Sequence, residues 1–353
     1  MSKLEKYTPP EWAADLSVIP QKVLRMAIRP SPLEKWHLPD AEVWIKRDDL
    51  TGCALSGNKV RKLEFLLAEA LSTGCDTVIT CGGIQSNHCR ATAAAAAEAG
   101  LKPHLVLSTN RPSEDPGLEG NLLLDRLLGA EIHLITPEDY LRRDDIMRET
   151  AERLRSSGRK PYIIPEGGSN ALGAWGYLSA WEEMRLQMEE SHPGITDVIV
   201  ACGSGGTAAG LALGAALSGS PVKIHAVNVN RNAQYFLGGV DEILRDMGAS
   251  QKAEDILDIM DGYVGEGYAA STDEELRQIA GVASSTGIIL DPVYTGKAFR
   301  GMMTELEKNP VRFQGRNILF VHTGGLLGLY EKIPQFANIL RRQVIKFRIP
   351  LIL

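Results

Sequence analysis

The stretch Asp197-Val-Ile-Val-Ala-Cys-Gly-Ser-Gly-Gly-Thr-Ala-Ala-Gly210 joins an apolar run to a glycine-rich turn and then to small residues. The apolar run predicts a buried strand, and residues 207–218 predict a helix. Glycines at such a turn leave successive backbone N–H groups free to face an anion, and the positive end of the helix dipole adds to the attraction. The stretch therefore predicts a phosphate-binding loop at the end of a strand.

A dinucleotide site is an alternative interpretation of this loop, because Gly203, Gly205 and Ala208 satisfy the pattern G-x-G-x-x-A. Such a site needs Asp or Glu at the end of the next strand to hold a ribose. The next apolar run, 223–229, continues into Asn230 and Arg231 and offers no acid. This weakens the nicotinamide interpretation, although Arg231 leaves an opening for a 2′-phosphate. A single phosphate group needs no ribose acid.

Outside this stretch, short apolar runs alternate with helical patterns along most of the chain. The expected strands are 42–47, 77–81, 104–108, 131–135, 161–165, 197–201, 223–229 and 317–322. The expected helices include 87–100, 119–128, 144–157, 175–190 and 207–218. Alternation of this kind is typical of βαβ units, and nearly continuous apolar strands have helices on both faces.

Two successive sets of these units, roughly residues 60–170 and 171–330, predict the fold class. We expect an α/β protein with two open, twisted, mostly parallel sheets flanked by helices. Open sheets of this type bind ligands at the carboxyl ends of their strands, so we expect a site in the cleft between the two units. The first 40 residues are expected to form an extended arm with a few turns.

The stretch Leu55-Ser-Gly-Asn-Lys-Val-Arg-Lys-Leu-Glu-Phe65 places one lysine where a polar turn becomes an amphipathic helix. Lys59 would lie near unpaired backbone N–H groups, with Arg61 and Lys62 beside it. These positive charges favour loss of its proton, as an amine nucleophile requires. Taken alone, the stretch is more typical of a solvated lysine in a basic first turn, and only the rest of the chain favours the nucleophile.

Other polar turns follow predicted strands. The run Gly82-Gly-Ile-Gln-Ser-Asn-His88 brings Ser86, Asn87 and His88 to a helix start, where they could face a carboxylate or a ring hydroxyl. A plain helix N-cap is the alternative interpretation, since Ser and Asn serve well there. The run Gly167-Gly-Ser-Asn170 has the same two interpretations.

Three further candidates lie close to predicted turns. Tyr294 precedes a helix, Tyr268 lies in a glycine-containing segment, and Thr323 follows the last predicted strand. A tyrosine in a turn is usually surface packing, and its phenol matters chemically only near a group with a shifted pKa. Thr323 is expected at the cleft because of its place after a strand.

Composition excludes several classes of protein. The net charge of -6 argues against nucleic-acid binding, and no apolar run approaches the roughly 20 residues that span a bilayer. Five cysteines without a CxxC pair indicate reduced thiols, and seven histidines without HExxH predict no catalytic metal. Residues 56–59 match S-x-x-K, but no partner motif of acyl-transfer enzymes is present. The first 20 residues lack the apolar segment of a secretory signal, so a cytoplasmic location is expected.

Taken together, these stretches resemble the fold-type II (tryptophan-synthase-like) pyridoxal 5′-phosphate (PLP) enzymes, in the branch of D-cysteine desulfhydrases and 1-aminocyclopropane-1-carboxylate (ACC) deaminases. The resemblance covers residues 44 to 325 and rests on the stretches 44–50, 56–64, 82–88, 203–207, 290–296 and 322–325. It implies a homodimer and a cleft between two domains. The implied larger, PLP-binding domain is 1–60 plus 171–353, and the smaller, mobile α/β domain is 61–170.

The resemblance also implies residue roles. Lys59 would be joined covalently to PLP, Asn87 would bind the pyridine 3′-oxygen and Thr323 the ring nitrogen. The phosphate would be held by Gly203, Ser204, Gly205, Gly206 and Thr207. The substrate carboxylate would be bound by Ser86, Asn87 and His88. Tyr294 and Tyr268 would face the substrate, and the catalytic groups would be Lys59, Tyr294, Ser86 and Tyr268.

Within this branch, the residue after the cleft tyrosine favours D-cysteine as the substrate. ACC deaminases carry Glu there, and this chain has Thr295. The expected reaction is α,β-elimination of D-cysteine to pyruvate, ammonia and hydrogen sulfide. The alternatives are ACC deamination, elimination from L-cysteate, D-serine or β-chloro-D-alanine, and a PLP carrier without turnover. Mitochondrial import is possible if a presequence is missing.

Overall fold

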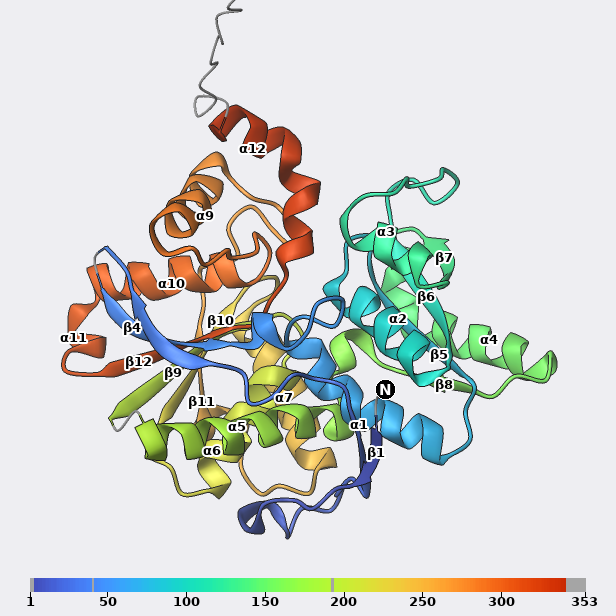
Figure 1. Ribbon diagram of the computed structural model, residues 1–353, viewed down its shortest axis with the longest axis horizontal. Coiled ribbons are helices and arrows are strands. Elements are labelled where there is room, and N and C mark those ends of the chain that lie inside the picture. The colour runs from blue at the N-terminus through green and yellow to red at the C-terminus, as the bar shows by residue number, and fades with distance from the viewer. Residues whose placement is uncertain (1–2, 40, 192–193, 341–353) are drawn as a thin grey trace, which may run out of the picture.

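The computed structural model describes residues 3–39, 41–191 and 194–340, and two separate sheets dominate it (Figure 1). The larger sheet has six strands in the order β11-β10-β9-β12-β4-β3. Their bounds are Leu257–Met260, Lys223–Asn228, Ile195–Cys202, Asn317–His322, Glu42–Arg47 and Leu33–His37. All neighbours are parallel except β3 and β4, which are antiparallel.

The smaller sheet has four parallel strands in the order β7-β6-β5-β8. Their bounds are Glu131–Ile135, Lys102–Ser108, Thr77–Gly83 and Pro161–Ile163. A separate antiparallel pair is formed by β1 (Lys3–Lys6) and β2 (Lys22–Arg25). Two open, mostly parallel sheets were predicted, and this prediction is confirmed.

Helices cover both faces of the larger sheet. The helices of the described chain are α1 Asn58–Ser72, α2 Asn87–Ala99, α3 Gly120–Leu127, α4 Arg143–Ser156, α5 Ala171–Ser191, α6 Gly206–Leu217, α7 Ala233–Asp246, α8 Ala253–Ile256, α9 Asp273–Thr286, α10 Thr295–Lys308, α11 Pro310–Phe313 and α12 Ile333–Leu340. Alternate residues of β9 enter different cores: Val198 and Val200 join that of α5 and α6, and Ile199 joins that of α9 and α10. This alternation is why the strand is apolar throughout.

The N-terminal arm was predicted incompletely. An extended arm with a few turns was expected, but residues 3–39 contain the paired strands β1, β2 and β3, and β3 forms an edge of the larger sheet. β11, also at an edge, was not expected either. These strands have four or five residues and several polar or exposed positions, so their sequences lack the continuous apolar pattern of inner strands.

All strands of the smaller sheet fall within residues 61–170, the predicted small domain. The predicted boundary at 60/61 lies inside α1, which packs on both α5 and α2 and so contacts both units. The two-domain division stays a prediction. No helix in the described ranges is long and apolar enough to cross a membrane, and all five cysteines are free thiols.

Candidate active site

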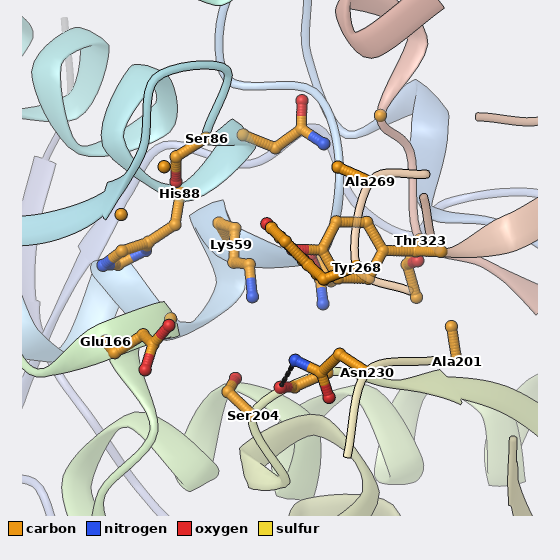
Figure 2. A pocket seen from close by; sticks show the side chains of 18 of the residues that line it. Lys59, Ser86, His88, Glu166, Ala201, Ser204, Asn230, Tyr268, Ala269 and Thr323 are labelled. Atoms are coloured by element: carbon orange, nitrogen blue, oxygen red, sulfur yellow. Dashed lines mark hydrogen bonds between the residues drawn. The ribbon is translucent and has the colours of Figure 1, made fainter. Parts of the chain in front are cut away.

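A cavity of about 640 Å³ lies where the carboxyl ends of strands from both sheets meet (Figure 2). The strands or the turns after them contribute Cys81, Ser108, Cys202, Asn230 and Thr323 to its walls. The sequence-predicted residues that line it are Lys59, Ser86, Asn87, His88, Gly203, Ser204, Gly205, Thr207, Tyr268, Tyr294 and Thr323. Gly206 is the one predicted residue that is not part of the lining. The fold therefore gathers residues separated by more than 260 positions.

Lys59 projects into this cavity from the first turn of α1 (Figure 2). The turn before it requires a glycine, because Gly57 has φ +106° and its ideal Cβ would lie 2.7 Å from the Thr323 carbonyl oxygen. The same carbonyl accepts the Asn58 N–H at 3.1 Å. Burial lowers the pKa of Lys59 to about 8, and the nearby charge of Glu166 opposes that shift.

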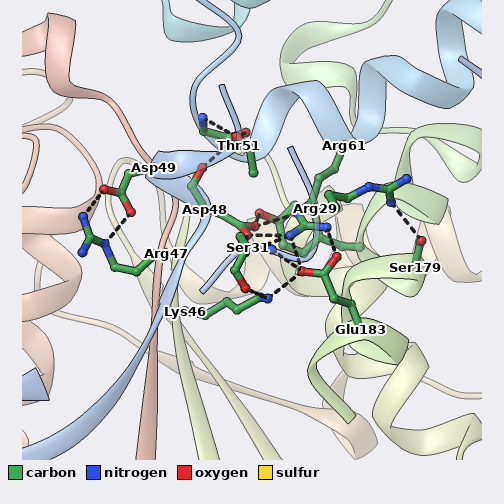
Figure 3. Close-up of polar contacts among 12 residues, drawn as sticks. Arg29, Ser31, Lys46, Arg47, Asp48, Asp49, Thr51, Arg61, Ser179 and Glu183 are labelled. Carbon is green, nitrogen blue, oxygen red and sulfur yellow. Dashed lines mark hydrogen bonds and ion pairs between the residues drawn. The ribbon is translucent and has the colours of Figure 1, made fainter. Parts of the chain in front are cut away.

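The low pKa of Lys59 has a different cause from the neighbouring positive charges expected from the sequence. Arg61 points away from the cavity and is fully buried in an ion-pair cluster with Asp48, Glu183 and Lys46 (Figure 3). Its charge is compensated there. Desolvation of the Lys59 ammonium, rather than neighbouring positive charge, is the main reason that its pKa falls.

The glycine loop leads from β9 into α6, as predicted. Gly205 has φ +82° and is followed by the helix N-terminus. Two contacts brace the loop from outside: Ser204 Oγ lies 2.8 Å from Ser169 Oγ, and Asn58 Nδ2 donates to Thr207 Oγ1 at 3.0 Å. The run 167–170, whose role was ambiguous, thus packs against this loop. Backbone N–H groups at the start of a 12-residue helix form a suitable site for a phosphate.

Lys62 is a residue of this site that the sequence argument treated only as a neighbour of Lys59. Its Nζ donates to Gly167 O at 3.2 Å and to Ser169 Oγ at 3.1 Å, and the side chain is buried. An ideal Cβ at Gly206 would lie 2.9 Å from this Nζ. Among the described residues, no carboxylate forms an ion pair with it, and burial holds its pKa well below the usual value. A phosphate dianion bound at the glycine loop would stabilise the charged form of this buried amine.

Ser86 and His88 have structural partners in addition to their place in the lining. Ser86 is the N-cap of α2, and its side chain accepts the Cys89 N–H at 3.2 Å. Ser86 therefore has the helix-capping role that was the alternative interpretation of this turn. His88 Nε2 lies 2.8 Å from Thr80 Oγ1 on β5, and burial lowers the pKa of this histidine well below its usual value. The ring is therefore a neutral group held against the small sheet.

Tyr268 and Tyr294 contact each other in the wall of the cavity that Lys59 also lines, although 26 residues separate them. Their hydroxyl oxygens are 2.9 Å apart, and their rings meet edge to face. Tyr268 as a residue is 47% exposed, but desolvation of its hydroxyl within the cavity raises its pKa to about 12, and burial raises the pKa of Tyr294 well above its usual value. Gly203 is needed for this packing, because its ideal Cβ would lie 2.7 Å from the Tyr294 ring. Both phenols are therefore neutral near pH 7.

An acidic group that no sequence motif indicated also lines the cavity. Glu166 accepts a hydrogen bond from Tyr140 at 2.9 Å and pairs with Arg143 at 3.1 Å. Asn230 likewise was not predicted as a site residue, and its Nδ2 donates to Gly203 O at 3.1 Å. Both residues enter the site from loops after strands, where composition and spacing carry little information.

Three potential metal ligands, His104, Glu131 and His133, cluster on β6 and β7, and none of them lines the cavity. His104 Nδ1 and His133 Nε2 are 3.1 Å apart, the length of a hydrogen bond from one imidazole to the other. Burial lowers the pKa of both rings, so each stays neutral. The two rings thus bond to each other, and the absence of a catalytic metal stays a prediction.

The residues present fit PLP. A half-buried amine with a lowered pKa and a glycine loop at a helix N-terminus line one cavity. A buried lysine, Lys62, lies beside that loop. The amine is suited to a carbonyl carbon and the loop to a single phosphate. The nicotinamide alternative would need a ribose-binding acid after β10, and Asn230 stands there instead.

Comparison with known proteins agrees with a PLP site in this cavity. Residues 24–324 match the family described as "Pyridoxal-phosphate dependent enzyme". The chain is 49% identical over 344 residues to a bifunctional D-cysteine desulfhydrase/1-aminocyclopropane-1-carboxylate deaminase, mitochondrial, of Arabidopsis thaliana, covering 95% of this chain and 86% of that protein. It is 39% identical over 319 residues to a D-cysteine desulfhydrase of Serratia proteamaculans, covering 86% and 94%.

Among solved structures, an ACC deaminase homologue aligns with a TM-score of 0.79 and 36% identity, over 90% of this chain and 96% of that one. The family match covers most of the chain, and the relatives are 36–49% identical to it. Common descent therefore explains why the lysine, the glycine loop and the two open sheets occur together. The protein belongs to the pyridoxal-phosphate dependent enzymes.

Proposed function

We propose that this enzyme is a D-cysteine desulfhydrase, a carbon–sulfur lyase. D-cysteine and water would give pyruvate, ammonia and hydrogen sulfide. The observation that carries the proposal is Lys59, an amine with a pKa of about 8 that faces the cavity beside the glycine loop. The names of the Arabidopsis and Serratia relatives support the same chemistry.

The proposed cofactor contacts follow from the placement of the residues. The N–H groups of 203–207 and the ammonium of Lys62 would hold the phosphate, Asn87 the ring 3′-oxygen and Thr323 the ring nitrogen. PLP, when bound, supplies an electron sink for the carbanion formed at Cα. A hydroxyl at the ring nitrogen would not protonate it fully, which suits elimination better than transamination.

The remaining steps belong to the protein. The Lys59 amine is suited to take the Cα proton because part of it is unprotonated near pH 8. A Tyr294 phenolate is less suited, because burial raises its pKa. The neutral Tyr294–Tyr268 pair would instead donate a hydrogen bond to the departing sulfur, while the start of α2 at Ser86 and Asn87 would hold the substrate carboxylate.

ACC deamination is the second candidate. Thr295, which replaces the glutamate expected of that activity, is buried and bonded to Asp291 at 2.7 Å, outside the cavity lining. This favours D-cysteine. However, Glu166 provides a carboxylate in the cavity, and the Arabidopsis relative is named for both activities. The two activities are therefore assayed side by side.

Lys59→Ala tests the proposal. The wild-type protein with PLP should show the visible absorption band of a lysine-bound cofactor and release sulfide and pyruvate from D-cysteine. Lys59→Ala should lose both the band and at least 99% of turnover, because the amine that binds PLP and moves the Cα proton is gone. Lys252→Ala, an exposed lysine elsewhere, is the matched control.

The outcomes separate the candidates. A band with sulfide from D-cysteine supports the desulfhydrase, and a band with 2-oxobutanoate from ACC supports the deaminase. Sulfite from L-cysteate would identify a third substrate. A band without any product would leave a PLP carrier, and easily measurable elimination by Lys59→Ala would exclude the proposed mechanism.

We further propose a homodimer and a cytoplasmic location, with the segment 61–170 as a mobile small domain. The resemblance in sequence supports the dimer, and the Arabidopsis relative is named mitochondrial, so import is the alternative location. Sedimentation equilibrium should give twice the mass of 38.4 kDa. Fractionation of cells that express the full chain distinguishes cytosol from mitochondria.

A further inference from the structure

Asn121, the second residue of α3, joins this helix to the turn at Gln85 and to the start of α2 at Asn87. It does not itself line the cavity. Its backbone N–H donates to Gln85 Oε1 at 2.9 Å, and its side-chain Nδ2 donates to Gln85 O at 2.9 Å. The same Nδ2 donates to Asn87 Oδ1 at 3.0 Å. Asn121 is fully buried, so these bonds are protected from water.

Arg90 determines which way the Asn121 amide faces. Its Nε donates to Asn121 Oδ1 at 3.2 Å. The guanidinium is itself held by the carbonyl oxygens of Ala54 and Ser56, the latter at 3.1 Å, in the loop before Lys59. Because arginine has only donors, the Asn121 oxygen must face it, and the Asn121 NH₂ group must face Asn87.

This arrangement also settles the Asn87 amide. The two ends of an asparagine amide differ only in being acceptor or donor, and the surrounding hydrogen bonds decide which end points where. Asn121 offers a donor, so Asn87 presents Oδ1 to it. What Asn87 can offer to the cavity that it lines is therefore Nδ2, a donor. Without Asn121, both orientations of the amide would be open.

We infer that Asn121 is a positioning residue: the chain Arg90–Asn121–Asn87 locks the Asn87 amide with its donor toward the phenolic oxygen of the cofactor. The inference rests on the proposed function, since it requires PLP with its 3′-oxygen at Asn87. A donor there stabilises negative charge on that oxygen. A proton is shared between this oxygen and the nitrogen that would join the cofactor to Lys59. With its negative charge stabilised, the oxygen holds that proton less strongly, and the pKa of the nitrogen is lower.

The visible band of the resting holoenzyme changes when this nitrogen loses its proton. The pH at the midpoint of that change is the quantity to be measured. Asn121→Leu keeps the branched shape at Cγ but cannot donate, so the Asn87 amide is free to turn and the midpoint should rise by about one pH unit. Asn121→Asp should raise it similarly, because an ionised carboxylate cannot donate but still accepts from Arg90. Asn338→Asp, exposed on α12, is the control for an added negative charge.

A double-mutant cycle tests whether Asn121 acts through Asn87. Asn87→Ala alone should raise the midpoint, and adding Asn121→Leu to it should change nothing further. Asp125, one turn along α3, titrates close to neutral pH because burial raises its pKa to about 7, so Asp125→Asn is measured in parallel. Circular dichroism and bound PLP are measured for every variant, and Asn121→Asp replaces Asn121→Leu if the latter does not fold.

The outcomes distinguish this inference from the proposed function. If wild-type protein forms no visible band with PLP, the proposed function is wrong. If the band forms but both Asn121 variants have the wild-type midpoint, Asn121 does not position Asn87. A midpoint in the double variant that exceeds that of Asn87→Ala would show an independent effect of Asn121 and would also overturn the inference.

Discussion

At the scale of single residues, burial and partners decide what each basic side chain of α1 can do. Lys59, Arg61 and Lys62 lie close together at the start of α1. Arg61 and Lys62 are fully buried and Lys59 is half-buried. Among the described residues, Arg61 is paired with carboxylates and neither lysine is. Desolvation without a countercharge disfavours an ammonium, so both lysines have lowered pKa values. One run of sequence thus contains a structural cation, an amine that lines the cavity and a buried amine beside the glycine loop.

Lys62→Met should weaken PLP binding, because it removes a buried amine next to the proposed phosphate site while keeping its apolar stem. A hydrogen bond between charged groups contributes about 1.5–3 kcal/mol, so the Kd for PLP should rise about 10- to 100-fold. Equilibrium titration of apoenzyme with PLP measures this change. Lys252→Met should leave the Kd unchanged, and an unchanged Kd for Lys62→Met would remove this lysine from the site.

Asp125→Asn should stabilise the protein above neutral pH. Both carboxylate oxygens of Asp125 are buried without a hydrogen-bond partner, and burial raises the pKa to about 7. The folded state therefore holds a proton that the unfolded state has lost, and stability falls as pH rises toward 7. Urea unfolding should show the variant about 2 kcal/mol more stable than wild type at pH 8 and about equal at pH 5. Equal stability at both pH values would contradict this.

At the scale of elements, the position of α1 is set by a buried polar cluster. Asp48 follows β4 and accepts hydrogen bonds from Arg61 at 2.7 Å, from Ser31 at 2.7 Å and from the Tyr177 hydroxyl of α5 at 2.6 Å (Figure 3). Glu183 of α5 completes the cluster. Strand β4, helix α1 and helix α5 are thereby fixed to one another two residues away from Lys59.

Asp48→Asn should destabilise the fold by about 3–5 kcal/mol at pH 7, because it leaves a buried arginine with less compensating charge. The Arg61 guanidinium and other donors lower the pKa of Asp48 to about 2, against the cost of its burial. Its contribution is therefore present above the unfolded pKa of 3.8 and is lost as pH falls toward 2.

Denaturant unfolding of Asp48→Asn at pH 7 and pH 3 checks both parts of this prediction. The difference in the free energy of unfolding between the variant and the wild type should be smaller at pH 3 than at pH 7. Asp246→Asn, which removes an exposed ion pair with Arg245, is the control and should cost under about 1 kcal/mol. A cost for Asp48→Asn as small as the control would show that the cluster does not hold α1.

At the scale of the whole molecule, the cavity depends on both sheets. Its walls combine residues after β9, β10 and β12 of the larger sheet with residues of β5 and β6 in the smaller one. A ligand that contacts both sides can stabilise the entire fold. The contact of α3 with the 3-10 helix η5 (Leu326–Lys332) also joins the two units near the cavity.

PLP should raise the melting temperature of the apoenzyme in a concentration-dependent way. A ligand at 100 times its Kd adds about 2.7 kcal/mol to the stability of the folded state. Lys59→Ala should show a smaller rise, because it cannot hold PLP covalently. NADPH at the same concentrations should give none, and a rise with NADPH but not with PLP would revive the dinucleotide interpretation of the glycine loop.

The inner part of the fold could be predicted from the sequence because its strands are apolar on both faces. β4, β7 and β12 occur at the expected residues, and β5, β6 and β9 extend the expected strands by two or three residues in all. The edge strands β1, β3 and β11 were not predicted, since an edge strand is short and partly exposed. Their pairing depends on neighbours distant in the chain.

Local sequence by itself determined the βα units, the glycine loop before α6 and Lys59 at the start of α1, because strand, turn and helix patterns act over a few residues. Only the tertiary structure decided that Lys62 faces the loop while Arg61 turns to Asp48, that Glu166 enters the cavity, and that Asn121 orients Asn87. Those features depend on which distant groups exclude water or complete a hydrogen bond. No local pattern encodes burial and long-range partners of that kind.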